Sequence, residues 1–298
     1  MSYQIELRHI KYFLAVAEEL HFRKAAEKLY ISQPGLSRQI KEMEDSLGIT
    51  LFHRHNRNVQ LTLAGQYLQE ELSKNLKQLD NILHHAKLLE DGKDGELNFG
   101  YVGSAMQRII PELLIKFTKN HPNVLFSLKE MDNIKQIDGL LAQDIDIGFV
   151  RLERIPRGLS SQLVLKEPFC LVLPKNHSIS HDTFKSVSQL KNESFILFDP
   201  EYSAAYYEKV MGIFDDSGFT PITSHNTIHA DSIYKLVENG FGISIVPKSL
   251  KSSENSNLKF IDLDMIPQRT SLSAVWKKDN SNPILAKAIA LIHKDITN

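Results

Sequence analysis

The chain has 298 residues, of which 42% are hydrophobic and 24% charged, a composition typical of a folded protein with about two domains. Its 35 lysines and arginines against 36 aspartates and glutamates give a net charge of −1, so nucleic-acid binding would require a local basic patch. A single cysteine, Cys170, excludes an internal disulfide and a cysteine zinc site and suits a reducing compartment. The N-terminal residues read as a helix rather than a signal peptide, and no apolar run reaches the roughly 18 residues of a membrane span. We therefore expect a soluble, cytoplasmic protein that does not bind a membrane.

Three helices are predicted in the first fifty residues. Apolar residues recur at helical spacing over residues 7–20, 22–29 and 33–47. Ser32 stands where an N-cap of the third helix is needed, and Gly48 is a suitable stop. Two short helices, a tight turn and a capped third helix form the pattern of a helix-turn-helix.

The third predicted helix leaves hydrogen-bonding and cationic side chains on its outward face, in the N-terminal half that a recognition helix inserts into the major groove. Two short strands, 50–52 and 59–61, enclose the basic loop 53–58, which is typical of a wing over phosphates. The alternative is that each polar side chain is simply solvated, because any three-helix packing exposes such a face. The candidate DNA contacts are Ser32, Gln33, Pro34, Ser37, Arg38, Lys41, Arg54 and Arg57.

These residues carry a family resemblance. Ala25-Ala26, the run Ser32-Gln33-Pro34-Gly35-Leu36-Ser37-Arg38-Gln39-Ile40, Leu47-Gly48 and Leu51-Phe52 closely resemble the winged helix-turn-helix of LysR-type transcriptional regulators. The following Leu61-Thr62-Leu63-Ala64-Gly65 looks like that family's entry into a linker helix, except that Leu63 stands where the family often has proline. The resemblance implies sequence-specific binding to double-stranded promoter DNA.

Residues 62–90 are predicted to form one long linker helix. Its apolar residues fall on a heptad-like seam, with the polar Asn75 on the same seam. The seam favours pairing with a second chain, and the alternative is packing on the helix's own domain. The resemblance implies homodimers or homotetramers formed through this helix. The seam comprises Leu61, Leu68, Leu72, Leu79, Ile82, Ala86 and Leu89.

Beyond the helix-breaking residues 91–95, strands and helices alternate, which predicts an α/β domain made of two lobes. The predicted strands are 97–102, 124–128, 145–150, 170–173, 195–197, 224–228, 243–246 and 271–276, and the predicted helices are 106–119, 134–142, 204–217, 232–238 and 283–294. The predicted domains are a winged helix-turn-helix (1–61), the linker helix (62–91) and an effector-binding domain (92–298), with lobe I at 92–166 and 269–298 and lobe II at 167–268.

Ligands of open α/β sheets bind beyond the carboxyl ends of the strands. Ser104, Asn133, Phe149 and Arg151 follow strands of lobe I, and Phe198 and Ser203 follow a strand of lobe II, so these six are the candidate effector contacts. The alternatives are that Ser104 only caps its helix and that Arg151 is a surface residue.

The resemblance extends to this region through Tyr101-Val102-Gly103-Ser104, Gly148-Phe149-Val150-Arg151 and the run 240–247. It implies an effector domain similar to periplasmic binding proteins, with the chain crossing between lobes near Lys166 and returning near Gln268. The branch that governs aromatic-compound breakdown uses a serine and a threonine to contact a carboxylate. Ser104 matches the serine, whereas Asn133 stands in place of the threonine. We therefore expect a small organic effector, a carboxylate by this resemblance, and regulation that extends to RNA polymerase recruitment.

The competing interpretations are an enzyme with an accessory DNA-binding domain and a secreted solute-binding protein. The sequence contains no G-x-S-x-G, Walker or G-x-G-x-x-G motif of an enzyme site, and a secreted binding protein has no use for a helix-turn-helix. The spacing of His177 with His181 and of His225 with His229 invites a metal interpretation, but neither pair lies on a predicted helix. Cys170 lies in an apolar strand and is expected to be inert. We predict a regulator, not an enzyme, that needs no cofactor or metal.

Overall fold

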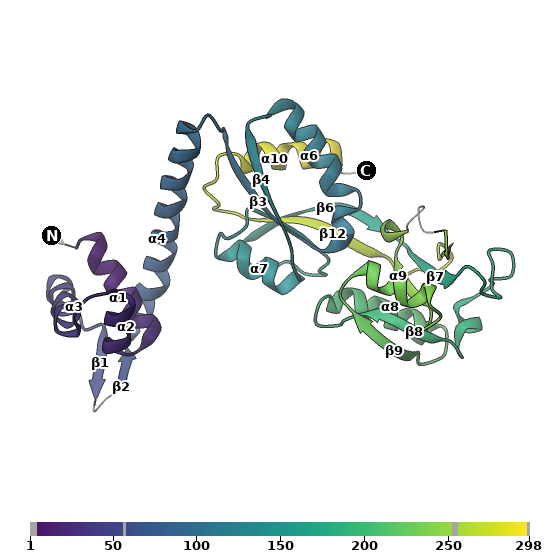
Figure 1. Ribbon diagram of the computed structural model, residues 1–298, viewed down its shortest axis with the longest axis horizontal. Helices are drawn as coiled ribbons and strands as arrows, with labels where there is room; N and C mark the ends of the chain where they lie inside the picture. Colours follow the sequence, from purple (N-terminus) through teal and green to yellow (C-terminus); the bar gives the residue numbers. More distant parts are fainter. Residues whose placement is uncertain (1–4, 56–57, 252–255, 297–298) are drawn as a thin grey trace. The chain divides into compact units, whose positions relative to one another are not determined.

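The structure is a computed structural model that describes residues 5–55, 58–251 and 256–296. The chain divides into two compact units, Met1–Ala86 and Lys87–Asn298 (Figure 1). Most of the helix that we predicted as a separate linker therefore lies in the same unit as the N-terminal helices. In the part of the chain that the structure describes, no helix is both long and apolar enough to cross a membrane.

The first unit is a winged helix-turn-helix. Its elements are α1 (Leu7–Glu19), α2 (Phe22–Lys28), α3 (Gln33–Leu47), β1 (Phe52–His55), β2 (Asn58–Leu61) and α4 (Leu63–Glu90). The Ser32 side chain caps α3 by accepting a 3.3 Å hydrogen bond from the Gly35 N–H, and Gly48 ends the helix at φ 69°. Phe13, Leu36 and related apolar side chains form the core beneath these helices.

The wing begins later than predicted. β1 and β2 pair antiparallel from Phe52 opposite Leu61. The carboxylate Oε1 of Glu44 accepts hydrogen bonds from the N–H groups of Leu51 and Phe52, at 2.8 and 3.2 Å. These bonds attach the residues at the start of the wing to α3. The predicted bounds 50–52 are therefore wrong, because the observed strand starts at Phe52, the last residue of the predicted one.

The start of α4 is packed directly against the approach to the wing. The Thr62 hydroxyl donates to the Thr50 carbonyl at 2.8 Å and accepts the Gly65 N–H at 3.0 Å. A Cβ on Gly65 would lie 2.3 Å from the Leu51 carbonyl oxygen, so only glycine allows this close approach. Leu68 and Leu72 continue the contact with the core.

Lobe I of the second unit is a five-stranded sheet in the order β4-β3-β5-β12-β6. The first three strands are parallel, and β12 runs antiparallel to both of its neighbours. Helices α6 and α10 lie on one face of the sheet and α7 on the other (Figure 1). The strands are β3 (Gly95–Tyr101), β4 (Val124–Glu130), β5 (Ile147–Val150), β6 (Leu159–Glu167) and β12 (Thr270–Lys277), and the helices are α5 (Gly103–Met106), α6 (Ile109–Asn120), α7 (Asn133–Leu141), α10 (Leu285–Leu291) and the π-helix η3 (Ile292–Ile296).

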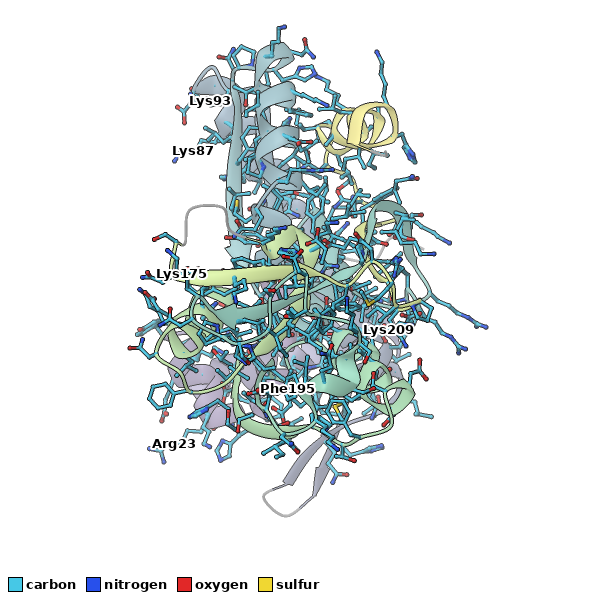
Figure 2. The ribbon with its side chains drawn as sticks, turned by 90° about the vertical axis from the view of Figure 1, so that its right-hand side faces the viewer. Arg23, Lys87, Lys93, Lys175, Phe195 and Lys209 are labelled. Atoms are coloured by element: carbon cyan, nitrogen blue, oxygen red, sulfur yellow. The ribbon has the colours of Figure 1, made fainter. Side chains whose placement is uncertain are left out.

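Lobe II contains two small sheets, β10-β7-β11 and β8-β9, linked by a bridge between Phe195 and Ile243. Phe195, labelled in Figure 2, is fully buried, and its ring centroid lies 4.6 Å from that of Phe214. The strands are β7 (Phe169–Pro174), β8 (Ser194–Phe198), β9 (Ile222–Thr227), β10 (Ser244–Pro247) and β11 (Leu258–Asp262), and the helices are η1 (Val187–Leu190), α8 (Ala204–Asp216), α9 (Ala230–Glu238) and η2 (Lys248–Leu250).

The predicted two-lobed α/β architecture is confirmed, with three larger differences besides shifts of a few residues at the ends of other elements. The predicted helix 106–119 is two helices, because Arg108 leaves helical geometry and Pro111 fits only the first turn of a new helix. The predicted helix 283–294 begins at Leu285 and ends in a π-helix. The strand predictions did not include β6 or β11. β6 and β12 pair over their whole length, up to Glu167 opposite Thr270, which is where the chain leaves lobe I and returns.

Candidate functional site

Arg151 is the centre of a buried polar cluster at the edge of lobe I. It follows β5 and is 4% exposed, so it is not the surface residue of the alternative interpretation. Its guanidinium donates from Nε to the Ser104 hydroxyl at 3.0 Å and from Nη1 to the Thr270 hydroxyl at 3.0 Å. Nη2 donates to Glu167 Oε1 at 2.6 Å. Burial lowers the pKa of Arg151, and the adjacent Glu167 carboxylate opposes that shift.

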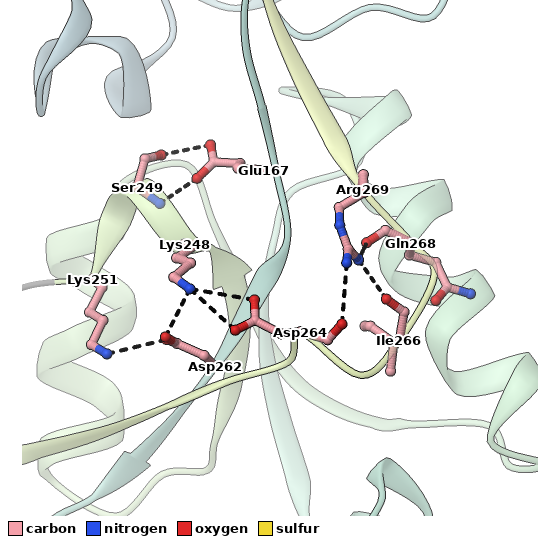
Figure 3. A network of polar contacts seen from close by, with 9 residues as sticks. All are labelled: Glu167, Lys248, Ser249, Lys251, Asp262, Asp264, Ile266, Gln268 and Arg269. Atoms are coloured by element: carbon pink, nitrogen blue, oxygen red, sulfur yellow. Dashed lines mark hydrogen bonds and ion pairs between the residues drawn. The ribbon is translucent and has the colours of Figure 1, made fainter. Parts of the chain in front are cut away.

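The Glu167 carboxylate links this cluster to lobe II. It accepts hydrogen bonds from both the backbone N–H and the hydroxyl of Ser249 in η2, the latter at 2.8 Å (Figure 3). Beside Ser249, Lys248 pairs with Asp262 at 2.9 Å and with Asp264 at 3.4 Å (Figure 3). These ion pairs fasten η2 to the end of β11, so Ser249 is held in place opposite Glu167.

Ser104 presents its hydroxyl to the same cluster. The N-cap of α5 is Val102, so Ser104 does not cap the helix as the alternative interpretation had it. Ser104 is buried, and its oxygen accepts the hydrogen bond from Arg151. An oxygen in that role leaves the hydroxyl hydrogen to be donated elsewhere.

A cavity of about 210 Å³ lies between the two lobes. Of the six candidate effector contacts, Ser104, Arg151, Phe198 and Ser203 line this cavity. The N-terminal end of α9 also lines it, at Ala230. The side chain of His229, the N-cap of that helix, accepts no capping hydrogen bond, so first-turn N–H groups of α9 remain to meet a ligand.

The other two candidates lie behind the cavity wall. Asn133 accepts the Arg151 backbone N–H at 2.9 Å through its Oδ1 and donates to the Ser203 hydroxyl at 3.3 Å. It therefore joins the lobes rather than lining the cavity. Phe149 is fully buried in the core of lobe I, stacked on Phe99, and its ring does not line the cavity either.

Glu130, at the end of β4, faces lobe II across the mouth of the cavity. Its Oε1 accepts a hydrogen bond from the Tyr202 hydroxyl at 3.4 Å and lies 3.4 Å from Nδ1 of His229. Burial raises the pKa of Tyr202 to about 12, and the charge of Glu130 adds to that rise. Burial and the Glu130 charge raise the pKa of Tyr101 as well.

The residues of this site that were not predicted from the sequence are Glu167, Thr270, Ser249, Glu130 and Tyr202. Ser249 and Thr270 reach Arg151 from 98 and 119 residues further along the chain, so spacing carries no sign of them. Glu167 carried a usable signal, because it is an acidic residue between the apolar runs of two strands and therefore needs a buried partner.

The proposed DNA-binding face lies on the first turns of α3. Ser32, Gln33, Pro34, Arg38 and Lys41 are exposed, and Ser37 is half-buried. Gln33 donates to the Ser37 hydroxyl at 3.1 Å, and Arg38 Nε lies 3.9 Å from the Glu42 carboxylate. Arg57 and the side chain of Arg54 lie outside the described residues.

The seam of α4 divides into two parts. Leu61, Leu68 and Leu72 pack on the core of the winged domain, which agrees with the packing alternative. Further along, the seam residues Ile82 and Leu89 are more than half exposed, as is their neighbour Leu83, which was not predicted to lie on the seam. The more exposed apolar side chains of the predicted seam therefore lie in this second part.

The side chains that invited a metal or redox interpretation have other contacts. His177 lies 3.3 Å from Glu193, and His225 packs edge-on against Phe241. Within the described ranges, no three histidine, cysteine, aspartate or glutamate side chains are grouped as a metal site. Cys170 is fully buried, which raises the pKa of its thiol to about 12.

Comparison with known proteins agrees with this architecture. Residues 7–66 match the family model of bacterial regulatory helix-turn-helix proteins of the lysR family, and residues 90–295 match the LysR substrate binding domain. The uncharacterized HTH-type transcriptional regulator YnfL of Escherichia coli is 32% identical over 284 residues, covering 95% of this chain and 96% of its own. The HTH-type transcriptional regulator AlsR of Bacillus subtilis is 32% identical over 281 residues, covering 94% of this chain and 93% of its own.

The structure of full-length CbnR complexed with its target DNA superposes with a TM-score of 0.66 at 27% identity, covering 97% of this chain and 99% of CbnR. YnfL and AlsR are both named as transcriptional regulators, in agreement with the prediction that the chain is not an enzyme. The chain belongs to the LysR family of transcriptional regulators, with an N-terminal helix-turn-helix and a C-terminal effector-binding domain.

Proposed function

We propose that the effector of this regulator is a small organic carboxylate bound in the cavity between the lobes. The observation that carries the proposal is the Ser104 hydroxyl, whose oxygen is occupied by Arg151 and whose hydrogen can donate into the cavity. The first-turn N–H groups of α9, on the lobe II side, supply further donors. Donors from both lobes can thus converge on one anionic group.

Arg151 supports this site indirectly. Its charge is matched by Glu167 and its side chain is 5% exposed, so it orients Ser104 rather than meeting the ligand as an unpaired cation. Phe198 and Tyr206 supply apolar surface for the body of the effector. This combination suits a carboxylate with an apolar, aromatic or short aliphatic, remainder.

In the proposed mechanism, the effector changes the contact between the lobes and hence the geometry of the assembled regulator. The exposed part of the α4 seam holds two chains together as a homodimer, and two dimers can form a homotetramer. Ser32, Gln33, Pro34, Ser37, Arg38 and Lys41 of each α3 contact the promoter, with Arg54 and Arg57 in the wing. CbnR has been solved on its target DNA, which supports this use of the domain. The change in DNA geometry would then alter the recruitment of RNA polymerase.

The test is a thermal-shift screen of the full chain with benzoate, salicylate and succinate, repeated on Ser104→Ala and on the control Ser160→Ala. Ser160 lies on β6, outside the cavity lining. A ligand at one hundred times its dissociation constant adds about 2.7 kcal/mol of stability, which shifts the melting temperature measurably. We expect stabilisation of the wild type and the control and its loss in Ser104→Ala. Equal stabilisation of all three chains would place the carboxylate elsewhere.

A further inference from the structure

Glu130 lines the cavity, but it has no role in the proposed function. Its carboxylate is a formal negative charge at a site proposed to receive another carboxylate, and like charges at short range repel. It is also the only acidic side chain of lobe I among the residues that line the described cavity.

Glu130 is exposed at the edge of lobe I, but its carboxylate turns towards lobe II. One oxygen, Oε1, reaches Tyr202 and His229 of lobe II, both at 3.4 Å. A Cβ added to Gly103 would lie 2.9 Å from this same oxygen, so the absence of a side chain at Gly103 makes room for it beside Ser104. The Glu130 carboxylate of lobe I thus lies in the cavity lining within 3.4 Å of two polar side chains of lobe II.

We propose that Glu130 is a tethered competitor, a carboxylate of the protein itself that occupies the lobe II donors until an effector carboxylate displaces it. Glu130 thereby sets the specificity of the cavity. An effector has to bind well enough to replace the contacts with Tyr202 and His229, so weakly bound monocarboxylates are rejected. This inference rests on the proposed carboxylate effector.

The energetic basis is the exchange of one charged contact for another. While Glu130 faces the cavity, an entering carboxylate meets a fixed negative charge that is only partly exposed to solvent. Replacing Glu130 by glutamine keeps the shape and the hydrogen-bonding oxygen but removes the charge. The neutral amide should both repel the effector less and release Tyr202 and His229 more readily.

The chain offers a matched control. Glu153 of lobe I pairs with Lys209 of lobe II at 3.1 Å, so it too is a carboxylate that joins the lobes, but it does not line the cavity. Glu153→Gln therefore loosens the lobes to a similar degree without changing the charge of the binding site. Any effect unique to Glu130→Gln comes from the cavity.

The experiment is isothermal titration calorimetry of the full chain with benzoate, salicylate and succinate. We expect Glu130→Gln to bind at least one of these about tenfold more tightly than the wild type, with Glu153→Gln close to the wild type. We expect Ser104→Ala, added to Glu130→Gln, to reverse the gain. A probe that binds only Glu130→Gln would support the competitor equally.

Three outcomes would overturn the inference. Unchanged binding by Glu130→Gln would show that the Glu130 charge does not oppose the effector, and weaker binding would show that Glu130 contacts the effector directly. In both cases the proposed carboxylate site would still stand. A gain in Glu130→Ala but not in Glu130→Gln would show that the side chain acts by its size. If no probe binds the wild type or any variant, the carboxylate proposal fails and the competitor fails with it.

Discussion

Nη2 of Arg151 donates a 2.6 Å hydrogen bond to Oε1 of Glu167, and the two side chains are 5% and 6% exposed. The pair connects the end of β5 to the end of β6, two strands that are separated in the sheet by β12. Removing one partner of a buried ion pair leaves the other charge uncompensated, whereas replacing both by apolar groups is often tolerated. The loss of stability on removing one of these charges should therefore depend on whether the other charge is still present.

We expect Arg151→Met to lower the free energy of unfolding by about 3–5 kcal/mol, because Glu167 is left buried without its cation. The double variant Arg151→Met/Glu167→Leu should lose less than the single variant. Urea unfolding of the effector-domain transition measures both. A double variant as unstable as the sum of the two single variants would show that the two charges do not act as a pair.

Arg38→Ala should weaken binding to the promoter by about 1–3 kcal/mol if the guanidinium contacts a base. The matched control is Arg108→Ala at the N-cap of α6, because each arginine faces a glutamate four residues later and both are exposed. Fluorescence anisotropy with a labelled duplex measures the affinity. Effector-induced thermal stabilisation should be unchanged in Arg38→Ala. Loss of effector response with intact DNA binding would contradict the assignment.

Ile82→Asp should shift the chain from dimer towards monomer, because it places a charge in the exposed apolar part of the α4 seam. Gln78→Asp adds the same charge at an exposed polar position of the same helix and should leave the dimer intact. Sedimentation velocity of both variants distinguishes these outcomes. Identical sedimentation of Ile82→Asp and wild type would place the dimer contact elsewhere.

The thiol of Cys170 should not react with a thiol reagent in the folded chain at pH 8 and should react once denaturant is added. The buried thiol ionises only near pH 12, against 9.0 as its ordinary value. The unfolded chain releases this proton first, so the contribution of Cys170 to stability is complete below pH 9.0 and falls as the pH rises towards 12. Cys170→Ala should lose less stability than the wild type between about pH 9 and 10.5. Parallel pH profiles for the two chains would exclude this contribution.

Local signals accounted for the best sequence predictions. The bounds of α3 were predicted as observed because Ser32 and Gly48 mark its two ends by side-chain and backbone chemistry that acts within a few residues. β6 was missed because its first half is polar, at Ser160-Ser161-Gln162, which leaves an apolar run of only three residues, Leu163-Val164-Leu165. The division of the helix at Arg108 was missed because Pro111 was treated as part of an unbroken helix.

The candidate site could be predicted only in part. Ser104, Arg151, Phe198 and Ser203 were found because the ends of successive strands meet at one edge of an open sheet. The direction of a side chain at that edge is set by tertiary packing, which is why Phe149 lies in the core and Asn133 beneath the cavity. Partners such as Thr270 become visible only once the order of β5, β12 and β6 is known.

The close approach at Gly65 makes the first turns of α4 an extension of the winged domain rather than a hinge. In the proposed dimer, the winged domain then turns together with α4. The rotation of α4 about its own axis therefore fixes the direction in which each recognition helix points. An α-helix turns by about 100° and rises about 1.5 Å per residue. One residue inserted between the domain-packed and exposed parts of α4 would therefore turn a recognition helix out of its groove. Four inserted residues, a little over one turn, would nearly restore its direction and shift it by about 6 Å along the axis of α4.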